Sequence, residues 1–154
     1  PVPSPSALEA LDWGIRHEYA AILQYLFHSF VIKDEETSRQ LELQAINEMQ
    51  HLGWLAEKLA GFGKAIPTEH HPVDLPKEIQ QMLTADIKLE TETAQKYEEF
   101  SGKVEELSVK ELLETLKAHE LYHKGLFHRL LERIRHLSPS GWTVGSLLKT
   151  EKEE

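Results

Sequence analysis

Cysteine is absent from this chain of 154 residues, so disulfides, thiolate metal sites and thiol catalysis are excluded. No apolar run reaches the roughly 20 residues that cross a bilayer, and no signal-peptide pattern is found. Basic residues are outnumbered, with 17 Lys and Arg against 26 Asp and Glu, and the net charge of −9 argues against a nucleic-acid partner. We therefore expect a cytoplasmic protein that binds neither nucleic acid nor a membrane.

Strand signals are poor, whereas apolar residues recur at helical spacing in four long stretches. The predicted helices span roughly residues 6–32, 37–60, 76–101 and 108–137. Short connections join the first pair and the second pair, which predicts two antiparallel hairpins. The second and third helices are joined by about 15 proline-rich residues, enough to run the length of a helix. We predict an all-α four-helix bundle with one long crossover in residues 1–137, and a flexible tail in 138–154.

Local patterns suggest where these helices begin. Ser6 with Glu9, and Ser108 with Glu111, have the spacing of a capping box, in which the two side chains satisfy free backbone N–H groups. Pro76 suits the first turn of the third helix, where a missing N–H costs nothing.

Two Glu-x-x-His motifs occupy matching places in the two halves of the chain. A single motif is weak evidence, because about one such pair is expected by chance in a chain this rich in Glu and His. Here each motif also follows another glutamate by 30 residues, so the whole set is repeated. The repeated residues are Glu18, Glu48 and His51 in the first half and Glu90, Glu120 and His123 in the second. Four carboxylates and two imidazoles are the ligand set of a carboxylate-bridged two-metal site in a helical bundle.

The spacing also predicts that the four glutamates meet inside the bundle. Glu18 and Glu48 are equidistant from one short loop, and Glu90 and Glu120 from the other, so all four lie at mid-height. Each is flanked at helical spacing by apolar residues. Burying four carboxylates without compensation is prohibitive, whereas two divalent cations balance their charge. Oxygen-rich ligands with few imidazoles suit iron or manganese. The alternative is that the glutamates are solvated.

Residues 7–137 resemble the ferritin-like superfamily, and bacterioferritin in particular. The likeness is strongest in residues 11–25, 47–51, 82–90 and 120–123. The resemblance implies that Glu18 and Glu90 are terminal metal ligands. It implies further that Glu48 and Glu120 bridge two metal ions, and that His51 and His123 are nitrogen ligands. It also implies that Tyr25 lies beside the centre. Tyr97 is its counterpart in the repeat, and core packing is the alternative for both tyrosines.

Met49 follows Glu48 directly, where bacterioferritins carry the methionine that holds haem across a dimer axis. A second apolar stripe on the first helix would be badly exposed in a monomer: Tyr19, Leu23, Phe27 and Phe30. The resemblance therefore implies a homodimer or a higher homo-oligomer, with haem b bound by Met49. Packing in a helix interface is the alternative for Met49. Leu43 and Asn47 depart from the polar and acidic residues that bacterioferritins often place beside the centre, which leaves the route of iron open.

The tail carries a second resemblance. Thr143–Leu147 resembles the C-terminal targeting peptide of proteins packaged in encapsulin shells, and a flexible linker, here residues 138–141, precedes it. Gly145 and the β-branched residues before it disfavour the fifth helix that ends bacterioferritins. The resemblance implies an encapsulin shell as partner, bound through residues 143–148, and a location inside that nanocompartment. A frayed tail or a divergent fifth helix is the alternative.

Together these features predict a ferroxidase, with two iron ions per subunit, that oxidises Fe(II) with O₂ for iron storage or detoxification. One competing hypothesis is a peroxide-scavenging diiron or dimanganese protein related to rubrerythrin or manganese catalase. A full-length rubrerythrin is excluded, because no Cys-x-x-Cys module is present. A free-standing haem-binding bacterioferritin cage and a bundle whose metal is only structural are two further hypotheses.

Overall fold

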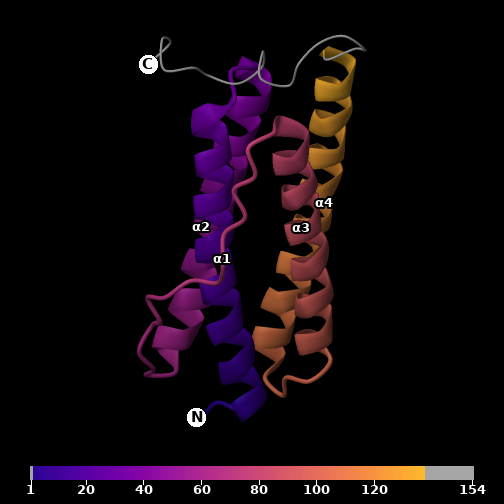
Figure 1. Ribbon diagram of the computed structural model, residues 1–154. Coiled ribbons are helices and arrows are strands. Elements are labelled where there is room, and N and C mark those ends of the chain that lie inside the picture. The colour runs from indigo at the N-terminus through magenta and orange to yellow at the C-terminus, as the bar shows by residue number, and fades with distance from the viewer. Residues whose placement is uncertain (1, 138–154) are drawn as a thin grey trace.

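The computed structural model describes residues 2–137, which form a bundle of four α-helices (Figure 1). The helices are α1 (Pro5–Val31), α2 (Glu35–Gly61), α3 (Ile79–Ser101) and α4 (Leu107–Leu137). α1 packs along α2 and α3 along α4, and the two hairpins meet mainly through α1 and α3. This arrangement confirms the predicted all-α fold. Within residues 2–137 no helix combines the length and the apolar character of a membrane span. The tail motif in residues 143–148 lies outside the described residues.

Two helix starts differ from the prediction because the first helical hydrogen bonds are accepted by residues other than Ser6 and Ser108. Ser4, not Ser6, caps α1, and its hydroxyl accepts the backbone N–H of Ala7 at 3.2 Å. Ser4 is itself held by Glu106, which accepts its N–H at 2.8 Å and its hydroxyl at 2.7 Å. Ser108 lies inside the first turn of α4, because the helical hydrogen bonds already begin at the carbonyl of Glu106. Glu106 thus ties the start of α1 to the start of α4.

The other two starts are shifted by two or three residues. Asp34 caps α2 by accepting the N–H of Thr37 at 3.1 Å, so the helix begins before Thr37. α3 begins at Ile79 rather than at Pro76, and its cap residue Glu78 makes no side-chain hydrogen bond. The chain just before Pro76 is hydrogen-bonded to α1 through Asp74.

Residues 62–78 form the predicted long crossover and run beside α1 from one end of the bundle to the other (Figure 1). Three of its hydrogen bonds to α1 involve backbone atoms of the crossover. The N–H of His71 donates to the carbonyl of Arg16 at 3.1 Å. The N–H of Asp74 donates to Gln24 Oε1 at 3.0 Å, and the carbonyl of Asp74 lies 2.9 Å from His28 Nε2. Because the crossover spans the full length, α2 and α3 run in the same direction.

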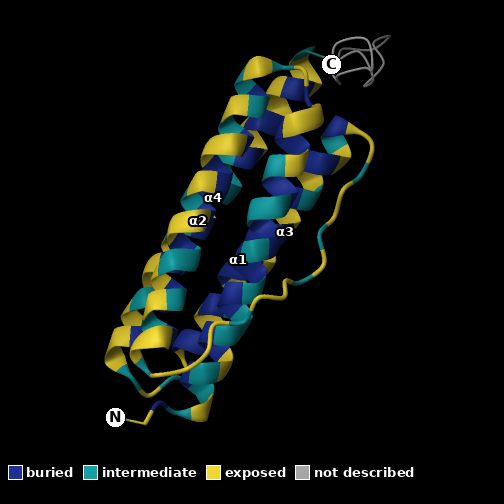
Figure 2. Ribbon diagram, turned by 90° about the vertical axis from the view of Figure 1, so that its left-hand side faces the viewer, coloured by how far each residue is buried: buried dark blue, intermediate teal, exposed yellow. Residues whose placement is uncertain are grey.

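The buried residues follow the inner face of each helix, as the dark blue segments in Figure 2 show. They form two apolar clusters. One contains Tyr25, Leu83 and Phe127, and the other contains Leu11 and Tyr97. Buried polar side chains accompany them, among them the four glutamates of the repeated set.

Candidate metal centre

Each of the four helices contributes one buried glutamate to the interior of the bundle. The exposed fraction is 0% for Glu18, Glu48 and Glu90 and 1% for Glu120. α1 and α3 supply the glutamates that stand alone, whereas α2 and α4 supply those that belong to Glu-x-x-His motifs. The two motif histidines are buried with them, at 1% and 4% exposed. The structure therefore brings together all six residues that the repeat singled out.

These side chains form two overlapping groups that could hold metal ions. The ligand atoms within each group lie within 4.8 Å of one another. We call Glu18, Glu48, His51 and Glu120 the His51 half, and Glu48, Glu90, Glu120 and His123 the His123 half. Glu48 and Glu120 belong to both halves, which is the position of a bridging carboxylate.

Both histidines turn the Nδ1 atom toward the carboxylates. His51 Nδ1 lies 2.9 Å from Glu120 Oε1 and 3.3 Å from Glu48 Oε2. His123 Nδ1 lies 2.8 Å from Glu48 Oε1. The two rings are nearly parallel, with an interplanar angle of 11° and centroids 5.7 Å apart. Each half thus has one nitrogen donor aimed at the shared pair of carboxylates.

Two buried tyrosines support the outer glutamates across the bundle. The hydroxyl of Tyr97 on α3 donates to Glu18 on α1 at 2.5 Å. In the mirrored arrangement the hydroxyl of Tyr25 on α1 donates to Glu90 on α3. Both rings are fully buried, so each tyrosine is at once a core residue and a partner of the cluster.

Without a cation the cluster retains protons. Burial, together with the charge of Glu48, raises the pKa of Glu90 to about 7 and raises the pKa of Glu18 well above its usual value. Burial alone would also raise the pKa of Glu48, but its polar neighbours Glu18, His123 and His51 lower it well below the usual range. Burial alone would lower the pKa of His51, but Glu18 and Glu48 outweigh it and raise this pKa to about 10.

The donor set fits divalent metal ions. One carboxylate oxygen on each of Glu18, Glu48 and Glu90 is buried with no hydrogen-bond partner, and an unpartnered buried oxygen is costly. Metal ions would use these oxygens and displace the retained protons. Carboxylate oxygens joined by two imidazoles are the donor chemistry of iron or manganese.

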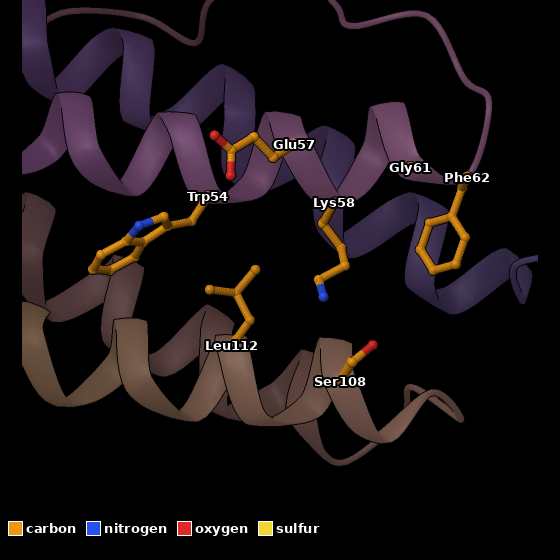
Figure 3. A pocket seen from close by; sticks show the side chains of 7 residues that line it. All are labelled: Trp54, Glu57, Lys58, Gly61, Phe62, Ser108 and Leu112. Atoms are coloured by element: carbon orange, nitrogen blue, oxygen red, sulfur yellow. The ribbon is translucent and has the colours of Figure 1, made fainter.

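A hollow of about 210 Å³ between α2 and α4 reaches the histidine side of the cluster. Its lining residues are Asn47, Gln50, His51, His119, Tyr122 and His123. Farther along the same face lies a larger hollow of about 500 Å³, which Figure 3 shows between Trp54 and Lys58 of α2 and Leu112 of α4. The smaller hollow is the one that leads from the surface to the cluster.

His119 and Trp54 join the cluster although the sequence pattern did not single them out. His119 Nδ1 lies 3.0 Å from His51 Nε2. The ring of Trp54 lies 5.6 Å from that of His51 and 5.8 Å from that of His119. His119 precedes His123 by one helical turn, and this i,i+4 pair was the available signal. It falls outside the repeat because its counterpart in the first half is Asn47.

The predicted apolar surface on α1 and α2 is exposed in part. The side chain of Met49 is 52% exposed and that of Ile46 is 44% exposed. Phe27 and Phe30 are also exposed, whereas Tyr19 is half-buried against the core. Met49 therefore points away from the cluster although it adjoins Glu48.

Residues 8–137 match the ferritin family, described as a ferritin-like domain. Bacterioferritin from Mycobacterium tuberculosis is 17% identical, with a TM-score of 0.83 and 95% of each chain covered. Bacterioferritin from Rhodobacter capsulatus is 18% identical, with a TM-score of 0.82 and 98% of each chain covered. A ferritin-like diiron-carboxylate protein from Bacillus anthracis is 26% identical, with a TM-score of 0.74, covering 83% of this chain and 99% of its own. Among curated proteins none matches the chain.

Proposed function

The chain belongs to the ferritin-like family, and we propose that it is a ferroxidase that binds and oxidises Fe(II) for iron storage or detoxification. The observation that carries the proposal is the pair of overlapping carboxylate and histidine groups at mid-bundle. Two Fe(II) substrate ions lose one electron each, and O₂ takes both electrons with two protons to give hydrogen peroxide. The likeness to the diiron-carboxylate protein of Bacillus anthracis supports iron as the metal.

The residues of the cluster have distinct roles in this proposal. Glu48 and Glu120 bridge the two ions, Glu18 and Glu90 hold one ion each from the outer side, and His51 and His123 supply one nitrogen each. Tyr97 and Tyr25 fix the outer carboxylates by hydrogen bonding. The charge of the four carboxylates offsets the growing positive charge as the ions are oxidised, and the hollow beside the histidines admits ions and O₂.

Rapid mixing of the metal-free protein with Fe(II) tests the proposal. Absorbance should show fast oxidation that saturates at two Fe(II) per chain, with one O₂ consumed for each pair. O₂ and H₂O₂ electrodes run in parallel identify the oxidant. If H₂O₂ is consumed far faster than O₂, with iron or with manganese, the protein is a peroxide scavenger. If neither oxidant reacts faster than with free Fe(II), the ferroxidase proposal is wrong.

We further propose a two-fold homodimer through the exposed apolar surface of α1 and α2, with haem b bound between two Met49 side chains. The exposure of Met49, Ile46, Phe27 and Phe30 supports it, because apolar side chains gathered on one face favour burial against a second copy. In the structure of the Rhodobacter capsulatus bacterioferritin the haem iron lies on a crystallographic special position.

Replacing Met49 with leucine is expected to abolish the spectrum of a low-spin, bis-methionine haem while leaving the dimer intact. The side chain keeps its apolar volume but loses the sulfur that binds iron. Absorption spectra after haem reconstitution and the mass in dilute solution provide the two readouts. Haem bound equally well by both proteins would overturn the ligand assignment, and a monomeric mass would overturn the dimer.

We also propose that residues 138–154 direct the protein into an encapsulin shell, on the strength of the Thr143–Leu147 pattern. An extended peptide with Val144 and Leu147 as apolar anchors suits binding along a groove. Each contact is weak because ordering a peptide on binding costs entropy, and many copies in one shell offset that weakness.

A chain ending at Leu137 is therefore expected to keep its Fe(II) oxidation and lose its loading into a co-expressed encapsulin shell. Purified shells are assayed for cargo by gel electrophoresis, with Val144→Asp and Leu147→Asp in the full chain as a matched test of the anchors. Loading that survives both changes, or a self-assembled cage that breaks on truncation, would contradict the targeting role.

A further inference from the structure

The two halves of the cluster differ in what lies behind their histidines. The internal repeat relates positions 72 residues apart, so that position 18 corresponds to position 90 and position 51 to position 123. Every proposed ligand is matched by an identical residue under this relation. The residue one turn before each histidine is not matched, because Asn47 precedes His51 and His119 precedes His123.

This difference matters because His119 contacts the histidine of the other hairpin, whereas Asn47 does not. His119 on α4 reaches across the bundle to His51 on α2, with 3.0 Å between His119 Nδ1 and His51 Nε2. Under the repeat, Asn47 is the residue that would support His123. Its amide instead donates to Gln44 Oε1 on its own helix at 3.2 Å. No hydrogen bond to His123 Nε2 is found in residues 2–137.

The hydrogen bond to His119 prepares His51 for metal. Nδ1 of His51 faces the carboxylates, so it must be free of its proton to bind a cation. The proton of a neutral ring is then on Nε2, from which it donates to His119 Nδ1. Such a partner fixes both the tautomer and the ring orientation of a ligand histidine. Trp54 packs against both rings and limits their rotation further.

We propose that His119 makes the two halves unequal, so that the His51 half binds its ion first and more tightly, whereas the His123 half is the exchangeable one. The hollow beside both histidines gives each ion a path to the surface, so the difference between the halves lies in the partner of His51 and not in access. This inference rests on the proposed function, because it assumes that the cluster binds two ions. His119 is a positioning residue, acting through His51 without contacting metal.

Titration of the metal-free protein with Co(II) alone tests the inference without any turnover. Two steps of unequal affinity are expected in the visible absorption of Co(II). His119→Ala should weaken the first step by about 10- to 100-fold, the usual cost of losing such a partner, and leave the second unchanged. His119→Gln keeps an acceptor for the His51 proton and should restore most of the loss. Gln50→Ala alters the lining of the same hollow without removing a hydrogen bond to either histidine, so it should change neither step.

The repeat supplies a gain-of-function counterpart. Asn47→His should place an imidazole behind His123 and tighten the second step toward the first. Crystals soaked with one equivalent of Co(II) should show anomalous scattering in the His51 half of the parent protein, and in both halves of Asn47→His. The metal-free proteins should unfold at similar temperatures, which separates positioning of His51 from general destabilisation.

Two results would overturn the inference while leaving the ferroxidase proposal in place. One is two equal Co(II) steps in the parent protein. The second is a His119→Ala variant in which both steps weaken alike. A parent protein that binds no Co(II), or that binds it unchanged after Glu48→Gln, would overturn the proposed function itself.

Discussion

Glutamine in place of Glu48 or Glu120 is expected to abolish the fast phase of Fe(II) oxidation. Each glutamate belongs to both halves of the cluster, so either change removes the charge and the second oxygen donor that hold two ions together. Loss of a bridge leaves at most one tightly bound ion, and two electrons can no longer be delivered as a pair. We expect the rate to fall at least about 100-fold, to the level of free Fe(II), in rapid-mixing absorbance measurements.

The same two variants are expected to change the stability of the metal-free protein in opposite directions. Glu48 is the ionised carboxylate of the cluster, with His123 hydrogen-bonded to it and His51 Nδ1 3.3 Å from its other oxygen. Its removal leaves buried positive charge unpaired, which typically costs about 3–5 kcal/mol. Glu120 has a pKa raised well above its usual value by burial and by the charges of Glu48 and Glu90. A neutral glutamine replaces it at little cost and removes the free energy needed to protonate this carboxyl on folding.

Thermal or urea unfolding in the presence of a chelator measures this difference. Glu42→Gln, on the exposed side of α2, is the matched control for losing one carboxylate from that helix and should behave like the parent. Fast oxidation that survives both cluster variants would refute the dinuclear site. Equal destabilisation by both would instead show that the charge is spread evenly over the carboxylates.

Raising the pH from about 6 to about 9 is expected to destabilise the metal-free protein. The difference between its melting temperature and that of the metal-loaded protein should increase. The pKa of His51 is raised to about 10. The stability that its protonation contributes is therefore fully present below about pH 6.5 and decreases as the pH rises toward 10. The pKa of Glu90 is raised to about 7, so its contribution also falls as pH rises, between about 4.5 and 7. Both groups act in the same direction.

Metal ions reverse this trend because they replace the same protons. Their affinity rises with pH as competition from protons weakens, and tighter binding adds stability by mass action. Melting temperatures measured with chelator and with excess Co(II) across this pH range give the difference in stability between the two forms. A loss of about 1 kcal/mol lowers the melting temperature by roughly 2–4 °C in a domain of this size. A difference in melting temperature that decreases as the pH rises would contradict the protonation assigned to His51 and Glu90.

That the six repeated residues lie together was predictable, because their positions follow from helical periodicity and from their distance to a short loop. Helical spacing determines which face of a helix a residue occupies, and equal distance from a short loop determines its height. Glu18, Glu48, Glu90 and Glu120 satisfy both conditions, and the structure buries all four together. The repeat also related Tyr25 to Tyr97. Which carboxylate each tyrosine supports was not predictable, because the two hydrogen bonds cross between hairpins.

Helix starts were predicted less well because capping depends on competition among neighbouring polar groups. Ser6 and Ser108 each have a capping-box partner in sequence, yet Ser4 caps α1 and the helical hydrogen bonds of α4 begin at the carbonyl of Glu106. Ser4 prevails because Glu106, about a hundred residues away, accepts its N–H and its hydroxyl. A sequence pattern of four residues contains no information about a contact with such a distant residue.

The order of the amino acids is sufficient to specify the helical repeat, the four-helix bundle with its long crossover, and the set of side chains that meet at its centre. The environment of each of those side chains depends instead on how the folded helices pack. His119 supports His51, whereas Asn47 turns to Gln44 on its own helix. Glu48 lies 2.8 Å from His123 Nδ1 and 3.3 Å from His51 Nδ1. Periodicity fixes the face and the height of a residue. Hydrogen bonds and charges across the bundle depend on distances between helices, which arise only when the two hairpins pack together.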